Sequence, residues 1–323
     1  MSTLSLRGPV RVTVRLHRWT LWAAVVLAFA GVVTVIATQL WTTSVSDAFA
    51  DTGCSIRNTT SDCDGTVRHF LDTELRFNHL LRYGGLVMML LPALVGAFVA
   101  GPLIGRELES GTYRLSWSQA VSPARWLVAR LAVPAVLTTA GVSVLSAVCT
   151  WARTRAERTH YPLEWYDREV YGAMGTVPVG YALCMLALGA LVGMVLRRTV
   201  GAMIVTVIAY GALVTALNSV RNSLWPTLTA TDSIEVGYPW PEGAANAGQG
   251  WVTSGGKRLS ADVCQNAKDY ERCLADNDIT LRYLDYHPAS HFWPLQLVET
   301  GILLALAALA VALTFRVLRR RHG

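Results

Sequence analysis

The chain has 323 residues, of which 52% are hydrophobic and only 15% are charged. Soluble globular proteins usually carry about one quarter charged residues, so this chain is far more apolar than a soluble enzyme. Its 28 lysines and arginines outnumber its 22 acids. In so apolar a chain, basic residues usually mark the cytoplasmic ends of membrane spans, which disfavours a nucleic-acid-binding role.

Six apolar stretches are long enough to cross a hydrocarbon core about 30 Å thick as helices. They are residues 19–41, 81–104, 126–151, 171–196, 200–219 and 294–315. The first follows a basic leader and precedes Ala48-Phe49-Ala50, which is compatible with a cleaved signal peptide. Its apolar run is longer than the usual ~7 to 15 residues of a signal peptide, so we expect a retained span. The sequence predicts an all-α polytopic membrane protein with six transmembrane helices.

Arginine placement predicts which side of the membrane each segment faces. Six spans put both termini on one side, together with two of the loops. Those segments hold only two acids and 14 arginines, which are Arg7, Arg11, Arg15, Arg18, Arg106, Arg114, Arg125, Arg130, Arg197, Arg198, Arg316, Arg319, Arg320 and Arg321. By the positive-inside rule this side is cytoplasmic.

The spans divide the chain into four parts. We expect a cytoplasmic amphipathic leading helix at 1–18, spans one to five at 19–219, a large extracytoplasmic loop at 220–293, and span six with a basic tail at 294–323. The second part includes an outer loop at 42–80 and a cytoplasmic loop at 105–125. Apolar periodicity predicts one helix over 67–81 that leads into span two, and another that begins at Ser260.

Four of the six cysteines, Cys54, Cys63, Cys264 and Cys273, fall in the predicted outer loops, where they can oxidise. Their two equal spacings favour local bridges. A continuous helix over 260–275 would separate Cys264 from Cys273 by about 13.5 Å along its axis, too far for a bridge. Either that helix breaks or the bridges join the two loops, because four cysteines allow three pairings. No C-x-x-C is present, so we expect structural rather than catalytic cysteines.

The cytoplasmic loop between spans two and three carries the most informative pattern. Residues 105–126 read GRELESGTYRLSWSQAVSPARW. Gly111 is a plausible helix break, residues 113–121 are compatible with a short helix along the membrane surface, and Ser122-Pro123 is typical of a helix start. A short helix held between two spans suits contact with a cytoplasmic partner. The alternative is a solvated loop anchored by arginines.

The pattern E-x-E-x-G-T-Y-R followed by S-Q-A-V-S-P-x-R-W resembles the first cytoplasmic loop of bacterial ABC transporter permeases of the type-two export superfamily. The six spans, the basic leading helix and the closing stretch YHPASHFWPLQLVETG are similar to actinobacterial members, so the resemblance covers the whole chain. It implies a location in the bacterial plasma membrane, and a coupling helix that contacts an ABC ATPase. The predicted coupling residues are Glu107, Glu109, Gly111, Thr112, Tyr113, Trp117 and Gln119.

The resemblance also implies two permease copies with two ATPase copies, surrounded by membrane lipid. The chain has no phosphate-binding loop of its own, because neither Lys257 nor Lys268 is followed by Ser or Thr. We therefore expect no cofactor on this chain, and ATP and magnesium on the partner ATPase. Members line their pathway with spans two and five, which nominates Met88, Met89, Thr206 and Tyr210. Export is expected from the resemblance, and a drug, antibiotic, peptide or lipid is the expected substrate.

Ionisable groups near the membrane are further candidates, since they are costly there. Arg82 and Glu299 both fall near the outer boundary, and we expect them to pair as an outer gate. His287, His291 and Asp285 are the basis of a weaker alternative, a membrane-embedded metalloenzyme, although Pro288 disfavours a helical ligand pair and no metal is expected. A secondary transporter is disfavoured by the lack of charged midplane sites. A sensor or immunity protein that acts through its outer loops is the main rival function.

Overall fold

A computed structural model describes residues 18–111, 122–156, 159–234 and 240–322. The chain divides into two compact units. The helical unit comprises residues 1–214 and 300–323, and the sheet unit comprises residues 215–299. Each unit is described by itself.

Long helices dominate the described chain. The helices and helical turns are α2 (Arg18–Ala50), α3 (Asp64–Leu94), η1 (Val95–Ala100), α4 (Gly101–Ser110), α6 (Pro123–Ala156), α7 (Arg168–Tyr171), α8 (Val177–Leu196), α9 (Thr199–Val220), η2 (Arg221–Ser223), η3 (Ala261–Cys264), α10 (Tyr270–Asp276), η4 (Ala289–His291) and α11 (Phe292–His322). The strands are β1 (Leu228–Ser233), β2 (Ala245–Thr253), β3 (Arg258–Ser260) and β4 (Ile279–His287).

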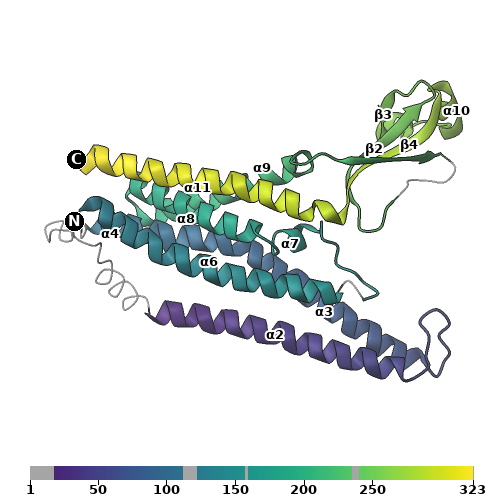
Figure 1. Cartoon of the computed structure of the whole chain (residues 1–323), viewed down its shortest axis with the longest axis horizontal. Helices are drawn as coiled ribbons and strands as arrows, with labels where there is room; N and C mark the ends of the chain where they lie inside the picture. The colour runs from purple at the N-terminus through teal and green to yellow at the C-terminus, as the bar shows by residue number, and fades with distance from the viewer. Residues whose placement is uncertain (1–17, 112–121, 157–158, 235–239, 323) are drawn as a thin grey trace. The chain divides into compact units, whose positions relative to one another are not determined.

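Six helical segments of the described chain are long and apolar enough to cross a membrane, which confirms the predicted number. They are residues 25–50, 64–110, 123–156, 177–196, 199–223 and 289–320. Most extend beyond the predicted spans because polar turns continue the helices at their ends. In the helical unit, the start of α2 and the ends of α4 and α11 lie at one end, and the loop between α2 and α3 lies at the other (Figure 1).

Span two is one continuous helical rod from residue 64 to residue 110 with an irregular middle. The predicted helix at 67–81 merges into it. Pro92 lies inside α3, and the next residues form the π-helical segment η1. Proline removes a backbone donor, so the wider helical turns follow the point where the regular hydrogen-bond ladder is interrupted.

The middle of span two packs tightly against α8. A β-carbon added to Gly189 would lie 2.3 Å from the carbonyl oxygen of Gly96, and one added to Gly193 would lie 2.9 Å from that of Gly101. The G-x-x-x-G spacing of Gly189 and Gly193 therefore serves close helix packing within one chain.

The sheet unit contains a four-stranded antiparallel sheet in the order β1-β4-β2-β3. Its small core consists of Trp251, Cys264, Leu274 and Ile279. The sequence pattern predicted one helix here and none of the four strands. The predicted helix from Ser260 is also corrected, because it breaks into η3 and α10. Asp269 caps α10 by accepting a hydrogen bond from the Arg272 amide.

That break removes the geometric objection to local disulfides. Cys54 pairs with Cys63 and Cys264 with Cys273, with Cα–Cα distances of 5.7 and 5.9 Å. The pairing favoured by the equal spacings is confirmed. Cys149 and Cys184 are free thiols.

Candidate functional site

The two described ends of the loop at 105–125 have the predicted geometry. Helix α4 ends at Ser110, and Gly111 adopts a left-handed backbone with φ of 71°, a conformation that glycine reaches at little cost. Helix α6 begins at Pro123, and the Ser122 hydroxyl accepts a hydrogen bond from the Arg125 amide at 3.4 Å. The break and the cap are confirmed. Thr112, Tyr113, Trp117 and Gln119 lie outside the described residues, so the coupling helix stays a prediction.

Glu107 ties the end of α4 to the start of α6. Its carboxylate forms an ion pair with Arg130 and accepts a hydrogen bond from Trp126 Nε1 at 3.0 Å. The Glu107 and Arg130 side chains are each about 20% exposed, so solvent screens this pair less than a surface one. The ends of the loop are therefore held together by a contact within the chain.

Glu109, two residues later, contacts the start of α9. Its Oε2 atom accepts hydrogen bonds from the Thr199 amide at 3.0 Å and from the Thr199 hydroxyl at 2.8 Å. The resemblance nominated Glu107 and Glu109 for coupling to an ATPase, and that role stays a prediction. Their described contacts are with spans three and five of the same chain.

An apolar cluster beside Glu107 joins four spans. Ile104 and Leu127 are completely buried in it, and Trp126 is buried beside Glu107. The buried members are Ala100, Ile104, Leu108, Trp126, Leu127, Leu186, Ala190, Met194 and Leu318. These residues come from η1 and α4 of span two and from α6, α8 and α11. A force applied to the loop therefore acts on a packed assembly, because protein interiors transmit strain.

A family model described as ABC-2 membrane transporter related matches residues 23–221. The chain belongs to this family. The match covers the five spans from α2 to α9 and includes the loop at 105–125. No curated protein and no solved structure matches the chain significantly. The protein is an ABC-2 type permease, a class of membrane subunit that generally works with an ABC ATPase.

The pathway residues nominated in this permease make contacts within the chain. Met88 is buried with Val142, Ala173 and Ala182. Thr206 is completely buried, and its hydroxyl donates to the Ala202 carbonyl at 2.7 Å. These two side chains pack against neighbouring helices, and their role in a pathway stays a prediction.

The other two nominated residues contact each other. The Tyr210 hydroxyl donates a hydrogen bond to the Met89 carbonyl, which joins α9 to α3. The Tyr210 ring also lies edge-on to Tyr181 of α8, with ring centroids 6.1 Å apart. Tyr210 is therefore a link between spans two, four and five of the permease.

Outward-facing residues of α3 and α9 were missed by the sequence analysis. Leu86, Leu90 and Leu94 of α3 are exposed, as are Ile204 and Ile208 of α9. In each helix they recur four residues apart, the spacing that places side chains on one face. That periodicity was available in the sequence, but a span that is apolar all round hides it.

The predicted ion pair between Arg82 and Glu299 is corrected. Arg82 Nε lies 2.8 Å from Glu169 Oε1, and Arg221 Nε lies 3.1 Å from Glu299 Oε2. Glu299 is completely buried in α11, and Arg221 follows the end of α9. Sequence reasoning considered only charges at the ends of spans two and six, and so overlooked both actual partners.

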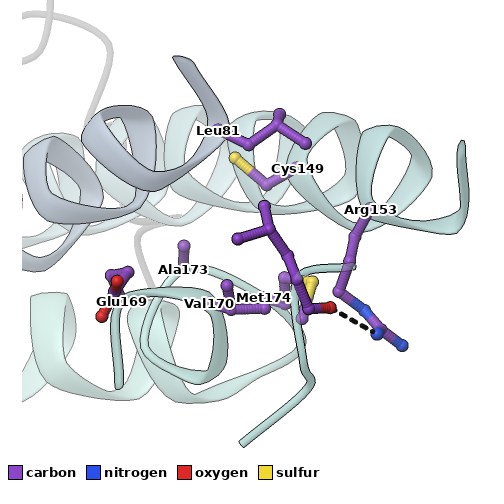
Figure 2. A pocket seen from close by; sticks show the side chains of 8 residues that line it. Leu81, Cys149, Arg153, Glu169, Val170, Ala173 and Met174 are labelled. Atoms are coloured by element: carbon purple, nitrogen blue, oxygen red, sulfur yellow. Dashed lines mark hydrogen bonds between the residues drawn. The ribbon is translucent and has the colours of Figure 1, made fainter. Parts of the chain in front are cut away.

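A small cavity lies between α3, α6 and the segment before α8, lined by Leu81, Cys149, Arg153, Leu163, Glu169, Val170, Ala173 and Met174 (Figure 2). Leu81 and Cys149 lie on one side of it, and Val170 and Met174 on the other. The Arg153 guanidinium donates to the Leu163 carbonyl at 3.4 Å. The cavity has a volume of about 20 Å³, which is room for one water molecule and far too little for a drug or peptide.

The histidines of the sheet unit form a pair. His287 Nδ1 lies 3.0 Å from His291 Nδ1, and His287 Nε2 lies 3.1 Å from the Asn222 carbonyl oxygen. Asp285, which the metalloenzyme alternative required, binds Arg258 and Thr229 instead. Among the described residues no three His, Cys, Asp or Glu side chains converge as metal ligands do. Burial of His287 and the nearby His291 charge lower the pKa of His287, against the opposing effect of its hydrogen bond to Asn222.

Proposed function

We propose that this permease is the membrane subunit of an ATP-driven exporter. A separate ABC ATPase hydrolyses ATP with magnesium, and two permease copies with two ATPase copies form the transporter. Both termini and the loop at 105–125 face the cytoplasm of a bacterium. The exported substrate is hydrophobic or amphipathic, such as a drug, antibiotic, peptide or lipid.

The cytoplasmic loop carries this proposal. Its two ends are fixed by Gly111 and Ser122, and Glu107 holds α4 against α6 directly beside it. A segment anchored at both ends to packed spans suits the transfer of a push from an ATPase into the membrane. The arginine-rich side of the spans supports the cytoplasmic orientation.

A membrane half needs no hydrolytic chemistry of its own. It changes between inward-open and outward-open arrangements when the ATPase binds the two arrangements with different affinity. Trp117 and Gln119 supply a large apolar surface and an amide for that contact. The apolar exposed faces of α3 and α9 suit lipid, a second copy or an apolar substrate.

The experiment is co-purification with the ABC ATPase encoded beside the permease, followed by ATP hydrolysis in lipid nanodiscs. The test variant is Trp117→Ala with Gln119→Ala. The matched control is Trp293→Ala, which removes an exposed tryptophan of α11. We expect wild type and control to form a complex whose hydrolysis depends on the permease, and the loop variant to lose either the complex or that dependence.

Failure of the folded wild-type chain to bind the ATPase would refute the exporter proposal. That result would favour the rival function, a sensor or immunity protein that acts through its outer loops. Equal behaviour of the loop variant and the wild type would refute the assignment of the contact to the loop.

A further inference from the structure

The start of α9 is held by α4 through two contacts that lie one helical turn apart. A β-carbon added to Gly105 would lie 3.4 Å from the Thr199 Cα, so the two backbones approach closely there. Glu109, four residues later and on the same face of α4, accepts hydrogen bonds from the amide and the hydroxyl of Thr199. Thr199 therefore contacts the backbone of α4 at Gly105 and the carboxylate of Glu109.

The Glu109 carboxylate acts as a helix cap supplied by another helix. The first amides of a helix have no partner within it, and the helix dipole favours a negative charge at that end. A helix usually supplies its own acceptor from Ser, Thr, Asp or Asn just before its first residue. Here that residue is Arg198, whose side chain has no acceptor. Glu109 of α4 fills the role instead.

The neighbouring turn makes α4, α8 and α9 one connected group. Arg197 ends α8 with a left-handed backbone, φ 54°, so that only Arg197 and Arg198 separate α8 from α9. Helix α8 also lies against α4, where a β-carbon on Gly193 would be 2.9 Å from the Gly101 carbonyl oxygen. A displacement of α4 therefore also displaces the first turn of α9, which is the start of span five.

We propose that Glu109 is a positioning residue that transmits movement of the cytoplasmic loop to span five. Glu107 performs the corresponding task for span three. This inference rests on the proposed function, since it needs an ATPase to move the loop. It also reassigns Glu109 from contact with the ATPase to a contact inside the permease that links the loop to a span nominated for the pathway.

Three substitutions separate this role from a merely structural one. Glu109→Gln keeps an acceptor oxygen but removes the charge, and Thr199→Val keeps the side-chain shape but removes the hydroxyl. Thr199→Ser restores the hydroxyl and is the conservative rescue. Glu271→Gln is the matched control, because it makes the same change at an exposed glutamate of α10 in the sheet unit.

The experiment measures hydrogen exchange of residues 199–204 in the permease–ATPase complex, without nucleotide and after trapping with ATP and vanadate. We expect trapping to change exchange of this first turn of α9 in the wild type, Thr199→Ser and Glu271→Gln. Glu109→Gln and Thr199→Val should assemble normally but lose that nucleotide-dependent change. Coupling between two sites usually changes the affinity at one of them by about 5- to 150-fold. We expect permease-dependent ATP hydrolysis to fall about fivefold in these variants. This is the low end of that range, because the contact between Gly105 and Thr199 remains.

The two proposals fail in different ways. If no ATPase binds the wild type, the proposed function is refuted, and the role of Glu109 is refuted with it. If the complex forms and Glu109→Gln and Thr199→Val both keep the wild-type response to trapping, the exporter proposal stands and the role of Glu109 is refuted.

Discussion

Gly189 of α8 lies so close to Gly96 of η1 that a β-carbon at position 189 would be 2.3 Å from the Gly96 carbonyl oxygen. The obstructing atom belongs to the backbone, so no side-chain rotation relieves the contact. This pair sets the distance between spans two and four of the permease. Only glycine allows this separation at position 189.

Gly189→Ala should therefore destabilise the permease. Overpacking usually costs about 1–3 kcal/mol of stability. We expect a loss near the upper end of this range for Gly189→Ala, because the obstructing atom belongs to the backbone. The matched control is Gly141→Ala, since a β-carbon at Gly141 meets nothing within 4 Å and alanine is the better helix former. Thermal unfolding in one detergent measures both. Equal unfolding temperatures for the two variants would contradict the tight approach.

The buried pair of Glu299 and Arg221 gives a second prediction. Removing one partner of a buried ion pair usually costs about 3–5 kcal/mol, because the remaining buried charge loses the opposite charge of that pair. Arg221→Met should therefore destabilise the chain strongly, and the double change Arg221→Met with Glu299→Met should recover much of the loss. Chemical denaturation of the two variants and of Arg82→Met measures this. A smaller loss for Arg221→Met than for Arg82→Met would mean that Glu299 does not depend on Arg221.

The spans and the loop ends were readable from the sequence because each depends on local chemistry. A run of about 20 apolar residues is enough to predict a span, and Gly111 and Ser122 act on their own backbone. The partners of Glu107, Glu109 and Glu299 were not readable, since each depends on which helices become neighbours. Arg130 comes beside Glu107, and Thr199 beside Glu109, only once α4 packs against α6 and α9.

The strands of the sheet were not predicted from the sequence for a different reason. Strand β2 contains Gly248 and Gly250, which weaken the strand pattern, and a bulge between Asn246 and Gly248 breaks its alternation. Tyr283 of β4 occupies the space that a side chain at position 250 would need, a relationship visible only across the sheet.

The disulfide between Cys264 and Cys273 should stabilise the sheet unit. Closing so short a loop constrains the unfolded chain and contributes about 2 to 3 kcal/mol. Cys264→Ser with Cys273→Ser should therefore increase hydrogen exchange in α10 and η3, and a membrane-impermeant reductant should do the same to the wild type in intact cells. Cys149→Ser is the control. Exchange in α10 that is unchanged by both treatments would show that the bridge does not stabilise this region.

The stability of the sheet unit should depend on the protonation of His287. Burial, the largest cause, lowers its pKa, so the folded form binds this proton less readily than the unfolded chain, whose histidine has a pKa of about 6.5. The stabilisation is therefore fully present above that value and is lost as the pH falls through the folded pKa. Hydrogen exchange in β4, corrected for intrinsic rates, should rise on acidification.

His287→Gln should flatten that pH dependence, and His69→Gln should leave it unchanged, because His69 is exposed on α3. The same acid-induced rise in the His287 variant as in the wild type would assign the effect to other groups.

The most direct test of the exporter account is site-specific crosslinking from the loop at 105–125. A photoreactive benzoylphenylalanine replaces Trp117 in one variant. In the other variant it replaces Ser254, which lies in the turn between β2 and β3. Each variant is co-expressed with the ABC ATPase that is encoded beside the permease. The account predicts a crosslink to the ATPase from position 117 and none from position 254. No crosslink from position 117 in a chain that folds and inserts, or equal crosslinks from both positions, would contradict it.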